Sequence, residues 1–93
     1  MKSERILTLH PQGKKGVNIR KEKYDRFRES IIDILKTNEK MSRKELLQEV
    51  TLKVEDDFEG SVSWYFTTVK LDLQARGEIK VEKVNGLQYV KCH

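Results

Sequence analysis

The stretch at residues 61–76, SVSWYFTTVKLDLQAR, constrains the fold more than any other part of the chain. At roughly 100° per residue, a helix places four of its apolar side chains on one narrow stripe, namely Val62, Phe66, Val69 and Leu73. Trp64 and Leu71 fall on nearly the opposite side. This helix therefore has two apolar faces. One can join a small core, and the other needs cover from a chain segment, a second subunit or a ligand.

Both ends of this helix carry signals, and two further helices are expected before it. Ser61 is a good N-cap and Gly77 suits the left-handed turn after the last helical position, so we expect the helix at residues 62–76. Ser42 and Glu45 form an S-x-x-E capping box, which predicts a second helix at residues 43–54. Helical spacing of apolar residues predicts a first helix at residues 20–36, through Tyr24, Phe27, Ile31, Ile34 and Leu35.

Asn85 and Gly86 form the strongest two-residue turn signal that a sequence offers, and they predict a two-stranded hairpin at residues 79–91. In that register Val84 faces Leu87, and strand alternation turns one side of the ribbon toward the core, with Ile79, Val81, Val90 and Cys92. At the other end of the chain, residues 1–18 form an arm in which residues 6–9 can make a short strand. We expect one α+β domain over residues 1–93.

Charge is unevenly distributed along the chain. Residues 1–28 hold nine Lys or Arg and three acidic residues, a net charge of +6, whereas the other 65 residues hold ten bases and twelve acids. A basic segment on a nearly neutral body is typical of proteins that meet polyanions, although a solvated surface is the more common explanation of charge runs. No stretch approaches the roughly 20 apolar residues of a membrane span, and the single cysteine agrees with a reducing compartment. We expect a cytoplasmic protein.

Motifs for phosphate, metal or catalytic chemistry are incomplete. Residues 12–16 place two glycines around two lysines, but the GxxxxGK[ST] spacing is missing. The four carboxylates at residues 55–59 lack the register of a calcium loop. Cys92, His10 and His93 have neither a paired metal-ligand spacing nor a third group to orient a nucleophile. We expect no catalytic site, no metal site, no cofactor and no small-molecule substrate.

Three helices, the second and third opened by serine caps, followed by a two-stranded ribbon are the order of a winged helix-turn-helix domain. More narrowly, the chain resembles DUF6958, a family of small bacterial winged-helix proteins of unknown function. The matching residues are 19–24 (IRKEKY), Trp64, 68–73 (TVKLDL) and Gly77. Arg20 departs from the acidic or amide residue of that family's pattern. The resemblance covers most of residues 5–80 and implies the winged-helix fold, with the hairpin as the wing, but no catalytic or binding residue.

Two functions from different classes follow from this arrangement. The first is a non-catalytic protein of transcription regulation that binds DNA through the basic arm and the wing. The residues expected to contact nucleic acid are Lys14, Lys15, Arg20, Lys21, Lys23, Thr67, Lys70, Lys80 and Lys83. Against it, the early outward positions of the third helix lack the usual base readers, and the acidic loop at residues 55–59 would repel phosphate.

The second function is a protein-interaction module without DNA binding. Trp64 and Leu71 lie seven residues apart on one helical face and would form a compact anchor for a protein partner or a second copy of the chain. A purely structural explanation also exists for this pair. Apolar residues of the arm would fold across Trp64 and Leu71 and cover them, namely Ile6, Leu7 and Leu9.

Overall fold

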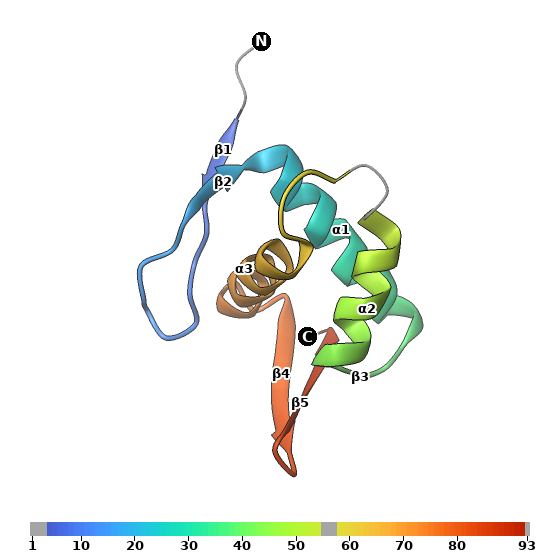
Figure 1. The fold of residues 1–93 in the computed structure, drawn as a ribbon. Helices are drawn as coiled ribbons and strands as arrows, with labels where there is room; N and C mark the ends of the chain where they lie inside the picture. Colours follow the sequence, from blue (N-terminus) through green and yellow to red (C-terminus); the bar gives the residue numbers. More distant parts are fainter. Residues whose placement is uncertain (1–3, 55–57, 93) are drawn as a thin grey trace.

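A computed structural model describes the chain over residues 4–54 and 58–92. In chain order the elements are β1 (Arg5–Leu7), β2 (Asn18–Arg20), α1 (Lys21–Thr37), β3 (Met41–Ser42), α2 (Arg43–Val54), α3 (Val62–Ala75), β4 (Ile79–Val84) and β5 (Leu87–Cys92). The three helices pack together above a C-terminal ribbon, and the β1–β2 hairpin lies at the side of α3 (Figure 1). Within the described residues no helix is both long and apolar enough to span a membrane.

The core lies where the three helices meet. The stripe expected on α3 faces inward, since Phe66, Val69 and Leu73 are fully buried and Val62 is half-buried. They pack in one cluster with the apolar sides of the other two helices, which include Phe27, Ile31, Leu46 and Val50. Apolar periodicity therefore predicted the buried face of each helix correctly.

Serine caps open α2 and α3 as expected. The Ser42 Oγ accepts a hydrogen bond from the Glu45 backbone N at 3.1 Å, and the Ser42 backbone N donates to Glu45 Oε1 at 3.2 Å. These two reciprocal bonds make a complete capping box. The Ser61 Oγ accepts from the Trp64 backbone N at 3.2 Å, and Gly77 ends the turn after α3 with a φ of +78°.

The wing has the predicted register. Val84 pairs with Leu87, and Val81 pairs with Val90. The turn residues Asn85 and Gly86 both have positive φ, at 51° and 81°, which is the geometry of the hairpin turn that an Asn-Gly pair favours. The sequence did not predict β3, which pairs with β5 so that the strand order is β3-β5-β4.

The arm forms a hairpin of its own. The expected strand at residues 6–9 is found as the shorter β1, which begins one residue earlier and ends two residues earlier. It pairs antiparallel with the unpredicted β2. Just beyond the paired strands, the Thr8 backbone N donates to the Val17 carbonyl at 2.8 Å. A Cβ at Gly16 would lie 1.7 Å from the Thr8 carbonyl oxygen. Only glycine lets the two sides of the arm approach this closely. We call residues 8–17, between β1 and β2, the arm loop.

A buried carboxylate attaches the arm and α1 to α3. Asp72 is 0% exposed, and its Oδ1 accepts a hydrogen bond from the Leu9 backbone N at 2.8 Å. Its Oδ2 accepts from the Tyr24 hydroxyl and from Arg76 Nε, the latter at 2.9 Å. Burial and the hydrogen bond to Asp72 raise the pKa of the Tyr24 hydroxyl. Three donors therefore compensate the burial of one negative charge.

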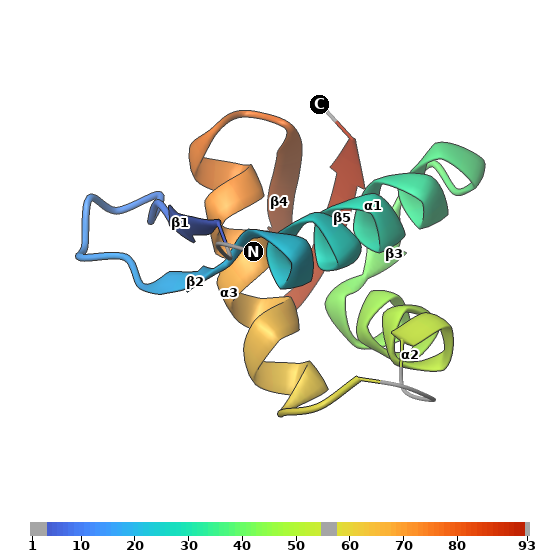
Figure 2. The same cartoon turned by 90° about the horizontal axis from the view of Figure 1, so that it is seen from above.

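The complete arrangement is mixed α and β, with three helices, two small antiparallel sheets and a C-terminal hairpin. It is compatible with the winged helix-turn-helix domain expected from the sequence. Seen from above, the β1–β2 hairpin lies on one side of α3 and α2 on the other (Figure 2). One long side of α3 therefore remains between the arm loop and the wing.

Candidate functional site

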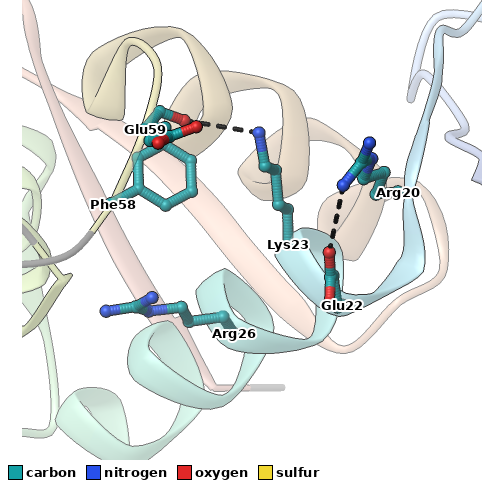
Figure 3. A pocket seen from close by; sticks show the side chains of 6 residues that line it. All are labelled: Arg20, Glu22, Lys23, Arg26, Phe58 and Glu59. Atoms are coloured by element: carbon teal, nitrogen blue, oxygen red, sulfur yellow. Dashed lines mark hydrogen bonds and ion pairs between the residues drawn. The ribbon is translucent and has the colours of Figure 1, made fainter. Parts of the chain in front are cut away.

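The basic residues at the start of α1 have partners within the fold. Lys21 Nζ lies 2.8 Å from Asp25 Oδ2, and Arg20 NH1 lies 3.5 Å from Glu22 Oε1. Lys23 Nζ donates to the Glu59 backbone carbonyl at 3.3 Å (Figure 3). The hydrogen bond and the charge of Asp25 raise the pKa of Lys21. The sequence predicted these three cations at the first turn of the first helix, and they lie there, where β2 joins α1.

A pocket of about 590 Å³ opens beside these residues, lined by Arg20, Glu22, Lys23, Arg26, Phe58 and Glu59 (Figure 3). The Lys23 ammonium lies 5.3 Å from the centre of the Phe58 ring and 5.2 Å from that of Tyr65. Phe58 in turn meets Phe27 edge to face at 5.0 Å. Basic side chains here thus connect α1 to the segment before α3, and two glutamates share the pocket with them.

The outer face of α3 consists of the side chains that turn away from the core: Trp64, Thr67, Leu71 and Gln74. Trp64 is 46% exposed and meets Tyr65 edge to face at 4.9 Å. Arg43, the first residue of α2, donates to the Thr67 Oγ1 at 2.8 Å. This arginine was not predicted, and it brings a positive charge to the edge of the outer face.

The arm loop borders one side of the outer face. Lys15 lines a hollow of about 90 Å³ together with Thr68 and Leu71 of α3, and Lys14 is exposed. Neither lysine has an ion pair within the described part of the chain. Leu9 also lines the hollow, but Trp64 does not. The expectation that arm residues would cover Trp64 and Leu71 is therefore wrong for Trp64, which stays 46% exposed. The arm lies farther along α3, where Leu9 lines the same hollow as Thr68 and Leu71.

The wing borders the other side of the outer face of α3. Strand alternation places Lys83 on the same ribbon face as Val81 and, across the strand pair, Gln88. Lys80 stands on the opposite face with Glu82, whose Oε1 lies 3.1 Å from Lys91 Nζ. Lys83 therefore belongs to the α3 side of the wing, and the prediction that groups Lys80 with it is not supported by the register.

Between the arm loop, α3 and the wing lies a pocket of about 430 Å³, which we call the arm–wing pocket. Its lining residues are His10, Pro11, Gln12, Lys70, Leu71, Gln74, Val81 and Gln88. Lys70 was predicted to stand beside the outward positions as a nucleic-acid contact, but it is only 4% exposed. Burial lowers its pKa, and the nearby Arg43 lowers it further. Lys70 is thus a pocket residue and not an open surface cation.

The structure therefore divides the nine predicted contact residues. Those around the outer face of α3 are Lys14, Lys15, Thr67, Lys70 and Lys83, and those away from it are Arg20, Lys21, Lys23 and Lys80. The glutamines at positions 12, 74 and 88 were missed as a group. They come from three separate segments, so no pattern along the chain could bring them together.

No group of three potential metal-ligating side chains was found in the part of the chain that the structure describes. Two sets of residues discussed in the sequence analysis lie outside the described residues. They are His93, weighed as a metal ligand or base, and residues 55–57, which hold three of the four carboxylates of the acidic loop.

These features define a small α+β domain with a basic arm, a long outward helix face and a C-terminal hairpin. A family model matches residues 5–89, and the chain belongs to that family, DUF6958, which is described as a family of unknown function. The match includes most of the arm, all three helices and most of the wing. Comparison with curated proteins and with solved structures found no match for this chain.

Proposed function

We propose that this protein is a non-catalytic winged helix-turn-helix protein that binds DNA, with a role in transcription regulation. The binding surface consists of the arm loop, the outer face of α3 and the wing. Third helices of such domains lie in the major groove, with flanking elements on the backbone.

One observation carries the proposal: the arm loop and the wing lie on either side of the same face of α3 (Figures 1 and 2). Lys14 and Lys15 stand on one flank, Lys83 on the other, and Arg43 at the edge of the helix. Among the described residues, no carboxylate forms an ion pair with any of these four cations. Their charge is therefore available to phosphate oxygens, which attract Lys and Arg strongly.

Side chains on the outer face supply little base-specific chemistry. The Gln74 amide can make a bidentate contact with adenine, accepting from N6 and donating to N7 on the major-groove edge. Thr67 already accepts from Arg43, and Leu71 offers only apolar contact. Most contacts would then go to the backbone, which positions a protein on the duplex without reading its sequence. We therefore propose binding with weak sequence preference.

Salt dependence of DNA binding tests this proposal. Fluorescence anisotropy with labelled duplexes of unrelated sequence should give measurable affinity at about 50 mM salt, and similar affinities for each duplex. Four phosphate contacts predict a slope of log K against log salt of about −3 to −4. Absence of binding at low salt would contradict the proposal.

Exposure of Trp64 favours the second candidate function, docking of a protein partner or of another copy through Trp64 and Leu71. The chain has one tryptophan, so its emission reports on this face alone. If DNA does not bind and Trp64 emission shifts with protein concentration, self-association through this face replaces DNA binding as the proposed function.

A further inference from the structure

The two buried charges of α3 are treated differently by the fold. Asp72 accepts hydrogen bonds from three donors. Lys70, two residues earlier, is nearly as buried, yet within residues 4–54 and 58–92 it has no hydrogen bond or ion pair. No fully buried side-chain nitrogen or oxygen of the described residues lacks a hydrogen-bond partner, so the stem of Lys70 is buried while its ammonium reaches the arm–wing pocket. The fold therefore keeps a cation at the arm–wing pocket with no anion of its own to balance it.

The surroundings of Lys70 add to this imbalance. Arg43 is close enough to disfavour the protonated lysine. Among the described residues Arg43 itself meets neutral groups, the Thr67 hydroxyl and the Phe66 ring, and no carboxylate. None of the residues that line the arm–wing pocket is acidic. Both cations would gain from a negative charge placed in the pocket, since the attraction between charges is stronger away from bulk water.

Neutral donors complete the lining. Gln12, Gln74 and Gln88 come from the arm loop, α3 and β5, and each carries a side-chain NH₂ group. No hydrogen bond commits any of these three amides elsewhere in the described structure. A tetrahedral phosphate has acceptors in several directions, which suits donors that arrive from three sides of a pocket.

We propose that the arm–wing pocket binds a phosphate group, with Lys70 as its charge partner and the amides of Gln74 and Gln88 as neutral donors. The phosphate has two potential sources, a nucleic-acid backbone or a small phosphorylated molecule. Because a free phosphate fits the same chemistry, the inference goes beyond the proposed function and does not depend on DNA binding.

Thermal unfolding of Lys70→Met tests the site with inorganic phosphate as the probe. In chloride buffer, Lys70→Met should unfold at a higher temperature than the wild type, because it removes a charge that partial burial disfavours and keeps the apolar stem. Phosphate at the same ionic strength should raise the Tm of the wild type by a few degrees. It should not raise that of Lys70→Met. Lys53→Met, on the exposed side of α2, is the matched control and should respond like the wild type.

Side-chain amide NMR provides a second readout that does not depend on stability. Phosphate should shift the Gln74 and Gln88 NH₂ signals in a saturable way in the wild type and not in Lys70→Met. An equal response of both proteins, or no response in the wild type at 100-fold phosphate excess over protein, would overturn the inference.

A DNA-binding measurement on the same variant separates the two sources of phosphate. If Lys70→Met also weakens duplex binding about tenfold, as expected for loss of one charge-assisted bond, and phosphate competes with the duplex, the phosphate belongs to the nucleic-acid backbone. If duplex binding is unchanged or absent while the phosphate response is retained, the pocket binds a small phosphorylated molecule. Each result supports the site and assigns its source.

Discussion

Replacing Asp72 by alanine should lower the free energy of unfolding by about 3 kcal/mol, the magnitude for breaking a buried, hydrogen-bonded charge pair. Asp72 is fully buried and accepts hydrogen bonds from Leu9, Tyr24 and Arg76. Alanine leaves the Tyr24 hydroxyl and the Leu9 amide without this acceptor and also creates a small cavity. Urea unfolding followed by circular dichroism measures the change.

Two variants separate the charge network from general damage. Tyr24→Phe removes one donor and should cost about 1–2 kcal/mol, with strong coupling to Asp72→Ala in a double-mutant cycle. Asp33→Ala changes an exposed carboxylate of α1 and should stay within about 0.5 kcal/mol of the wild type. If Asp72→Ala were as stable as Asp33→Ala, the network would not hold the arm and α1 to α3.

Reversing the charges of the arm loop should produce the largest loss of DNA affinity. In Lys14→Glu with Lys15→Glu, two exposed cations that lack ion pairs in the described structure become anions. We expect affinity at low salt to fall at least about tenfold and the salt slope to become shallower by about 2, one for each lost phosphate contact. Anisotropy titrations at four salt concentrations measure both quantities.

The matched control carries the same change in net charge elsewhere. Lys36→Glu with Lys53→Glu alters exposed residues in the last turns of α1 and α2, and these helix ends lie away from the arm loop (Figure 1). We expect this variant to keep a slope close to that of the wild type. Equal losses in both variants would mean that binding follows net charge alone and that the arm loop has no special role.

Local patterns predicted most of the fold because each signal acts over a few residues. Ser42 and Ser61 mark helix starts through bonds to residues three positions away, and Asn85 with Gly86 sets the wing register through its own backbone angles. The strands β2 and β3 were missed because strands of two or three residues form only when a distant partner is in place. Their sequences carry too little pattern to show this.

The site was harder to predict, since it depends on how segments converge. Lys15 and Lys21 lie six residues apart, yet one lies against α3 and the other pairs with Asp25 at the start of α1. The helical pattern placed Lys70 to one side of the outer face, but it could not show that the wing and the arm loop line one pocket with it. Strand alternation could have separated Lys83 from Lys80, because the register was already predicted from the turn.

The two motifs that carry the family resemblance meet in the structure. Tyr24 ends the IRKEKY segment and Asp72 lies within TVKLDL, and the hydroxyl of one donates to the carboxylate of the other across 48 positions of sequence. Sequence reading assigned Tyr24 to the core and gave Asp72 no role. The hydrogen bonds of the buried Asp72 carboxylate therefore give both residues a structural role: they hold the arm and α1 against α3.

Chemical-shift mapping of the backbone amides during titration with a short DNA duplex tests the central claim most directly. If the arm loop, the outer face of α3 and the wing form one binding surface, the largest shifts should fall on residues 10–17, 67–74 and 83–88. Shifts centred instead on residues 20–26, or no shifts at low salt, would contradict the account.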